Sequence, residues 1–207
     1  MAHESLRDQL RLILVTPDRE DLATDELDSL VANGVQGGVT SIMFREKRLS
    51  DSEFVVQAKR LGEVAGKSGG RRLILNERMH LSGLIEPDML HLTWRSQIPA
   101  DWCPSVPVGR SVHTVEEGRD VEAEVDYLIF GPIYSTPSKE GLVEAQGVDL
   151  LAELCQSIAV PVVAIGGINP ERARLCCGAG AVGVAALSGL QQGIAAEFAA
   201  AVSEGVA

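Results

Sequence analysis

The sequence alternates between short apolar runs and segments with the apolar spacing of helices, and this alternation occurs eight times. The runs are rich in Val, Ile and Leu on both faces, as expected for strands of a parallel sheet covered by helices. They span Arg11–Pro17, Val39–Arg45, Arg72–Asn76, Met89–Thr93, Pro107–His113, Asp126–Ile133, Pro161–Gly167 and Ala181–Ser188. This pattern predicts the α/β class and a single (β/α)8 TIM barrel domain over residues 1–207, with a parallel eight-stranded sheet. The alternative is an open doubly wound sheet, which usually contains fewer strands.

Local signals mark where two of the helices begin. Ser50 with Glu53 forms a capping-box pattern, and Asn169-Pro170-Glu171 combines a cap, a first-turn proline and an acidic first turn. The segment Trp94–Pro104 is short and contains proline, so we expect an irregular crossover there. Residues 1–10 are expected to form an N-terminal extension or helix.

Composition excludes several classes of partner. The formal net charge is −11 and no basic tract is present, whereas binding to nucleic acid needs clustered Lys and Arg. The N-terminus lacks the apolar core of a signal peptide, and glycines and glutamines interrupt the uncharged run Leu175–Ala196, so we expect a cytoplasmic protein without a membrane segment. The cysteines show no Cys-x-x-Cys spacing, so we expect reduced thiols rather than a metal site or disulfides. They are Cys103, Cys155, Cys176 and Cys177.

Two glycine-containing turns stand where many barrels bind a phosphate. Gly166-Gly167 follows the seventh predicted strand and Ser188-Gly189 follows the eighth. Active sites of TIM barrels lie at the C-terminal ends of the strands, and turns without side chains let backbone N–H groups approach an anion. The alternative is that these glycines only turn the chain.

The fifth predicted strand places a histidine at its end. Alternation puts Gly109, Ser111 and His113 on one face, so that an imidazole able to transfer protons near neutral pH stands at the barrel mouth. The alternative for His113 is a hydrogen-bonded residue at the rim. His91 lies between two leucines and is interpreted as structural.

Other polar residues at strand ends are candidate ligand contacts. Arg45 and Lys47 are two residues apart and could both hold an anion, although a solvated run of charges is the alternative. Thr136, Ser138 and Lys139 follow the sixth strand on a loop long enough to cover the site. Their hydroxyl and ammonium groups suit a phosphate or diphosphate, and the alternative is a polar surface loop.

The order of these motifs resembles the thiamine-phosphate synthase/TenI superfamily of small (β/α)8 barrels. The resemblance extends from the first strand to the eighth and so covers nearly the whole chain. The stretches that carry it are Leu12–Thr16, Arg45–Lys47, Leu75–Arg78, Gly109–His113, Phe130–Lys139, Val163–Ile168 and Gly178–Ala185.

The chain departs from the synthase pattern of this superfamily. A synthase joins a pyrimidine diphosphate to a thiazole phosphate with Mg²⁺ and releases pyrophosphate. Its pattern has glutamine at Met43, aspartate at Glu77, and a further aspartate past the fourth strand, where this chain reads Thr93-Trp94-Arg95-Ser96. A hard cation needs carboxylate oxygens at fixed reach, so these changes argue against metal-assisted departure of a diphosphate. Arg45-Glu46-Lys47 and Thr136–Lys139 nevertheless retain elements that would hold a diphosphate.

The Gly-Arg-Ser-Val-His motif at Gly109–His113 is similar to that of TenI-like thiazole tautomerases. This resemblance implies an isomerase of thiamine biosynthesis that aromatises a carboxythiazole phosphate, with His113 as general acid/base and without metal or other cofactor. The phosphorylated thiazole is expected at Gly166, Gly167, Ser188 and Gly189, with further contacts from Arg45, Lys47, Asn76, Ser111, Thr136, Ser138 and Lys139. A synthase, which alone would need Mg²⁺, and a non-catalytic thiazole-phosphate-binding regulator are the alternatives. Homo-oligomers through the outer helices are compatible with such a barrel.

Overall fold

The computed structural model describes residues 5–18, 23–68, 72–99, 103–135, 144–191 and 193–206. Its parallel strands close into a barrel in the order β1 to β8, with β8 pairing back to β1. The strands are β1 (Leu12–Val15), β2 (Ser41–Phe44), β3 (Arg72–Asn76), β4 (Met89–Leu92), β5 (Val108–Val112), β6 (Tyr127–Phe130), β7 (Val162–Ile165) and β8 (Gly183–Ala186). The predicted eight-stranded (β/α)8 barrel is therefore confirmed.

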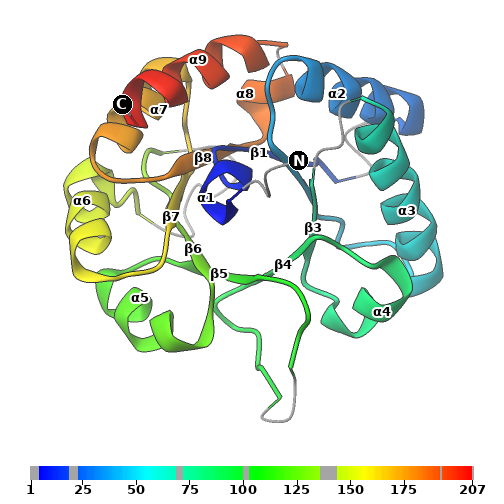
Figure 1. Cartoon of the computed structure of the whole chain (residues 1–207), viewed down its shortest axis with the longest axis horizontal. Coiled ribbons are helices and arrows are strands. Elements are labelled where there is room, and N and C mark those ends of the chain that lie inside the picture. The colour runs from blue at the N-terminus through cyan, green and yellow to red at the C-terminus, as the bar shows by residue number, and fades with distance from the viewer. Residues whose placement is uncertain are drawn as a thin grey trace.

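Helices surround this barrel as an outer ring (Figure 1). The ring consists of α2 (Thr24–Gln36), α3 (Asp51–Lys67), α4 (Ser82–Ile85), α5 (Val115–Val121), α6 (Gly147–Ser157), α7 (Pro170–Gly178), α8 (Ser188–Gln191) and α9 (Ala195–Val206), whereas α1 (Leu6–Gln9), which precedes β1, lies outside this ring. The described residues also form the short 3-10 helices η2 (Met79–Leu81), after β3, and η3 (Glu122–Glu124), after α5. Among the described residues, no helix is long and apolar enough to span a bilayer.

Apolar side chains of the strands alternate between two clusters. Leu12 and Leu14 of β1 belong to the outer cluster, where the barrel packs on the helices. Ile13 and Val15 belong to the inner cluster, which fills the barrel together with Tyr127 and residues of the other strands. This alternation follows from the period of two along a strand, and it decides which polar residues reach the barrel mouth, meaning the C-terminal ends of the strands.

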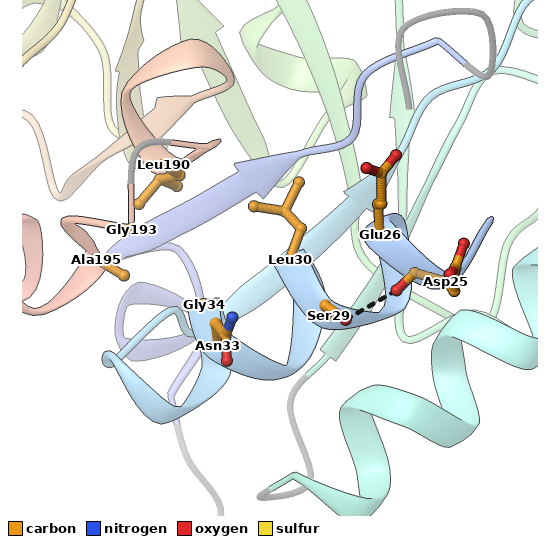
Figure 2. A pocket seen from close by; sticks show the side chains of 9 residues that line it. All are labelled: Asp25, Glu26, Ser29, Leu30, Asn33, Gly34, Leu190, Gly193 and Ala195. Carbon is orange, nitrogen blue, oxygen red and sulfur yellow. Dashed lines mark hydrogen bonds between the residues drawn. The ribbon is translucent and has the colours of Figure 1, made fainter. Parts of the chain in front are cut away.

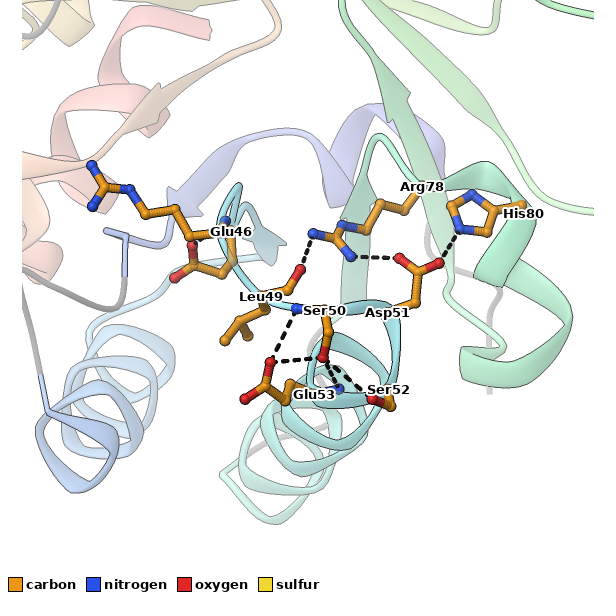
Figure 3. Close-up of polar contacts among 9 residues, drawn as sticks. Glu46, Leu49, Ser50, Asp51, Ser52, Glu53, Arg78 and His80 are labelled. Carbon is orange, nitrogen blue, oxygen red and sulfur yellow. Dashed lines mark hydrogen bonds and ion pairs between the residues drawn. The ribbon is translucent and has the colours of Figure 1, made fainter.

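Both predicted helix caps are present. Ser50 Oγ accepts a hydrogen bond from Glu53 N at 3.4 Å, and Glu53 Oε2 accepts one from Ser50 N at 3.0 Å, which completes the capping box of α3 (Figure 3). Asn169 Oδ1 accepts a bond from Arg172 N at 2.9 Å, with Pro170 in the first turn of α7. The described residues of Trp94–Pro104 contain neither helix nor strand, so the irregular crossover is also confirmed there.

The short helix α1 lies across the centre of the barrel in the view along its axis (Figure 1). Leu10, its C-terminal cap, is fully buried in the inner cluster, and Leu6 packs against the same cluster. Burying these apolar side chains stabilises the closed N-terminal end of the barrel. The opposite end carries the polar groups described next.

Candidate active site

His113 directly follows β5 and lies beside a carboxylate. Its Nδ1 is 3.6 Å from Glu117 Oε2, and the same carboxylate oxygen accepts a hydrogen bond from His113 N at 2.6 Å. Glu117 is held in place because Thr114 caps α5 and accepts a bond from Glu117 N at 3.1 Å. The edge-on ring of Trp94 lies 6.2 Å from the His113 ring. A carboxylate close to one ring nitrogen can orient an imidazole, an arrangement that is compatible with general acid/base chemistry.

A second polar group lies deeper in the barrel. His91 on β4 is buried, and its Nε2 is 2.8 Å from Ser111 Oγ on β5. Asn76, at the end of β3, donates from Nδ2 to His91 O at 3.2 Å. Burial lowers the pKa of His91 to about 3, so this imidazole is neutral at physiological pH. Asn76 and Ser111, both predicted ligand contacts, are thus brought together around His91.

Glu77 connects the ends of β3 and β4. Its Oε1 accepts hydrogen bonds from Thr93 N at 2.6 Å and from Ser96 Oγ at 2.5 Å. The backbone at Glu77 and Arg78 is left-handed, with φ of 59° and 48°. This conformation is strained for residues with a side chain, so the surrounding contacts must stabilise it. Glu77 therefore fastens the loop after β4.

This loop does not provide the carboxylates of a magnesium site. Mg²⁺ binds hard oxygen ligands, chiefly carboxylates, but Oε1 of Glu77 is committed to two donors. In the stretch after β4, where the synthase pattern has a further aspartate, this chain carries Arg95, whose guanidinium lies 4.6 Å from the Trp94 ring centroid. Within the described ranges, no three His, Cys, Asp or Glu side chains gather closely enough to hold a metal ion. The described residues therefore do not fit the Mg²⁺ site that the synthase resemblance implies.

The other predicted anion contacts differ in their placement. Arg45 Nη1 is 3.3 Å from Asp18 Oδ2, so its guanidinium is already paired with the loop after β1. Lys47 is exposed. Thr136, Ser138 and Lys139 lie outside the described residues.

The β7–β8 side of the mouth is formed by glycine turns. Gly166 and Gly167 have φ of 103° and 62°, which L side chains rarely adopt. A Cβ on Gly167 would lie 2.7 Å from Ser135 O, so the turn also lacks space for a side chain. Gly167 O accepts a bond from Arg172 Nη1 at 2.6 Å, and the Arg172 guanidinium stacks 4.3 Å from the Tyr134 ring centroid. Ser188 and Gly189 are the first residues of α8, which follows the neighbouring strand β8.

Two further polar features lie outside the predicted site residues. A pocket of about 360 Å³ between α2 and the α8–α9 segment includes Asp25, Glu26 and Leu190 in its lining (Figure 2).

Arg78 pairs with Asp51 at 2.6 Å, and His80 contacts the same carboxylate at 2.9 Å, which joins the β3 loop to α3 (Figure 3). Hydrogen bonding from His80 and the nearby Arg78 charge lower the pKa of Asp51.

The cysteines are free thiols, in agreement with the sequence prediction. Burial raises the pKa of Cys155 and Cys177 to about 11 and that of Cys176 to about 12. These side chains are therefore protonated and unreactive near neutral pH.

Sequence reasoning missed several contacts of the mouth. It did not identify Glu117 as the partner of His113, although Thr-x-x-Glu at the start of a helix is a recognisable capping signal. It also missed the fastening role of Glu77 and the His91–Ser111 pair. Arg110 donates to Trp94 O at 3.4 Å and also to Ser96 O, so it holds the same loop. No local pattern signals these long-range contacts.

The closed barrel, with its polar side chains and glycine turns gathered at the C-terminal ends of the strands, has the organisation of a (β/α)8 barrel enzyme. The family model described as "Thiamine monophosphate synthase" (TMP-TENI) matches residues 12–190. The chain belongs to this family.

Individual relatives agree with the family match. The chain is 36% identical over 196 residues to a thiamine-phosphate synthase from Albidiferax ferrireducens, covering 92% of this chain and 88% of the relative. It is 36% identical over 185 residues to one from Syntrophomonas wolfei, covering 86% and 87%. The solved structure of a thiamine phosphate pyrophosphorylase from Pyrococcus furiosus superposes with a TM-score of 0.83 at 24% identity, covering 98% of this chain and all of that one. At this identity the superposition shows the shared fold.

Proposed function

We propose that this protein acts in thiamine biosynthesis as a thiazole tautomerase, which aromatises a carboxythiazole phosphate by proton transfer. The observation that carries the proposal is the pairing of His113 with Glu117 at the end of β5, with Nδ1 3.6 Å from the carboxylate. The reaction needs one base that takes a proton from ring C2 and returns it to the exocyclic carbon. The ring gains aromaticity, and no electron acceptor is consumed.

Each part of the chemistry falls to a separate group of the mouth. His113 takes the proton and becomes imidazolium, which the negative charge of Glu117 stabilises until the proton is returned. Backbone groups of Gly166, Gly167, Ser188 and Gly189 would hold the phosphate, since turns without side chains suit close approach of an anion. Arg45 and Lys47 would face the substrate carboxylate, and for Arg45 this requires sharing or leaving its pairing with Asp18. Thr136, Ser138 and Lys139, which lie outside the described residues, stay predicted ligand contacts from the sequence.

The test is conversion of the non-aromatic tautomer in the presence of EDTA. Wild-type protein is expected to turn over without added metal, and His113→Gln is expected to lose at least about a hundredfold in kcat. His80→Gln is the matched control, because His80 is an exposed histidine that contacts Asp51 on α3. It should retain wild-type turnover. Equal turnover in His113→Gln and the wild type would remove His113 from the mechanism.

A second candidate is thiamine-phosphate synthase activity. Three curated relatives, at 31–36% identity, are named thiamine-phosphate synthase, and these names favour this alternative over the tautomerase prediction. Its test is release of pyrophosphate from the pyrimidine diphosphate and thiazole phosphate with Mg²⁺ added. Release that depends on Mg²⁺, with no aromatisation in EDTA, would replace the tautomerase by the synthase. Saturable binding of thiazole phosphate without either reaction would instead indicate a non-catalytic binder.

A further inference from the structure

His91 has one ring nitrogen bonded and the other without a partner. Nε2 is 2.8 Å from Ser111 Oγ, while the buried Nδ1 has no hydrogen-bond partner among the described residues. The side chain is 2% exposed, so solvent does not reach either nitrogen freely. Ser111 is half-buried and closer to the mouth on the adjacent strand. The pair therefore connects the sealed interior of the barrel with the site.

This asymmetry selects one tautomer. A neutral imidazole has one N–H donor and one bare nitrogen acceptor. Burying an N–H without an acceptor is costly and rare, whereas an unpaired acceptor is tolerated more often. The unpartnered Nδ1 is thus the bare nitrogen, and Nε2 carries the proton.

The tautomer fixes the direction of the neighbouring hydroxyl. With Nε2–H donating, Ser111 Oγ acts as acceptor toward His91, and its own hydrogen points away from the imidazole. Among the described residues, the Ser111 hydroxyl forms its hydrogen bond with His91. We propose that His91 is a positioning residue, which holds the Ser111 hydroxyl as a hydrogen-bond donor toward an acceptor atom of the ligand in the mouth. The ligand half of this inference rests on the proposed function.

The Tyr127 ring packs beside the His91 ring and restricts rotation of the imidazole away from Ser111. The His91 ring lies 5.7 Å from the Tyr127 ring, and the Tyr127 hydroxyl donates to Leu90 O at 3.1 Å. Gly109, which pairs with His91 across the sheet, leaves the space that the Tyr127 ring occupies, since a Cβ there would lie 2.1 Å from the ring. The Tyr127 ring, in the space left by Gly109, thus packs beside the imidazole and restricts its movement.

The tautomer can be measured without any ligand. Nitrogen-15 NMR of the histidine-labelled wild-type protein separates protonated from bare ring nitrogens, and the His91 signals are assigned by their loss in His91→Gln. We expect a neutral ring with the proton on Nε2. A proton on Nδ1, or on both nitrogens at neutral pH, would overturn the inference.

The consequence for the ligand is tested by a double-mutant cycle, with affinity for the aromatic carboxythiazole phosphate measured by calorimetry. Ser111→Ala and His91→Phe should each weaken binding by about threefold to tenfold, and the double variant should be no weaker than Ser111→Ala alone. His91→Gln keeps an N–H near the Nε2 position and should restore much of the affinity.

Additive losses would show that His91 acts only on packing and would overturn the positioning role. A wild-type protein that does not bind the thiazole phosphate would contradict the proposed function instead, and the NMR result would still decide the tautomer. If His91→Phe does not fold, Ser111→Ala is compared with His91→Gln instead of using the full cycle. His91→Gln should then bind the thiazole phosphate more tightly than Ser111→Ala.

Discussion

The two sides of the barrel mouth are built from different parts of the polypeptide. The β3–β5 side consists of side chains that hydrogen bonds hold in place, among them Glu77, His91 and Ser111. The β7–β8 side consists of backbone turns whose glycines, Gly166 and Gly167, have positive φ. The difference matches the chemistry proposed for each side: proton transfer needs a placed side chain, whereas an anion can be held by backbone N–H groups alone.

The largest effect is expected on the backbone side. Gly167→Ala forces a left-handed backbone on an L residue and places Cβ 2.7 Å from Ser135 O. We expect a loss of about 2–3 kcal/mol in the free energy of unfolding and at least a tenfold rise in KM, because the turn proposed to bind the phosphate is displaced. The bound substrate should still react with nearly unchanged kcat. Urea denaturation and steady-state kinetics measure the two quantities.

Gly180→Ala is the matched control for this prediction. Gly180 has φ of 110°, and its Cβ would lie 2.9 Å from Cys155 Cβ in the turn before β8, at the opposite end of the barrel. It should lower stability comparably and leave KM unchanged. Equal rises in KM for both variants would remove the phosphate site from the β7–β8 turns.

A smaller effect is expected from the side chains of the β3–β5 side. Glu77→Ala leaves Thr93 N and Ser96 Oγ without their acceptor, and we expect a loss of about 2 kcal/mol in stability. Glu77→Gln retains an acceptor oxygen and should lose less. Thermal or urea unfolding measures both, and turnover of Glu77→Gln in EDTA should remain close to wild type. Turnover that requires Mg²⁺ and disappears in Glu77→Gln would instead give Glu77 a metal-binding role.

The smallest effect is a pH dependence caused by His91. Its pKa falls from 6.5 to about 3 on folding, so the unfolded chain binds a proton that the native protein excludes. Stability therefore decreases as the pH falls below 6.5, approaching about 1.4 kcal/mol per pH unit. Urea unfolding of the wild type between pH 6.5 and 5 should show this dependence, and His91→Gln should lack that part of it. An identical pH dependence in both proteins would contradict the assignment to His91.

The sequence predicted the barrel well because its signals are local. Alternating apolar runs identified the strands, and Ser50 and Asn169 identified helix starts that the structure confirms. The glycine turns after β7 and β8 were likewise recognisable, since a glycine pair at a strand end is visible in the sequence. Their role in binding phosphate remains a prediction.

The contacts of the β3–β5 side could not be predicted in the same way. Glu77 stands where the synthase pattern has a metal ligand, and only its contacts with Thr93 and Ser96 show what this carboxylate does in this chain. His91 looked like a core residue, and it is buried as expected. Its bond to Ser111 depends on the register of β4 and β5, which pairs His91 with Gly109.

By itself, the sequence determined the class of fold, the order of the strands and the strand ends that meet at the barrel mouth. These depend on periodicity, caps and turns within a few residues of each other. Only the tertiary structure decided which residues of different strands and loops touch: Glu77 with the loop after β4, and His91 with Ser111. Closing the barrel fixes the stagger between neighbouring strands, and hydrogen bonds of about 3 Å depend on that stagger rather than on any spacing along the chain.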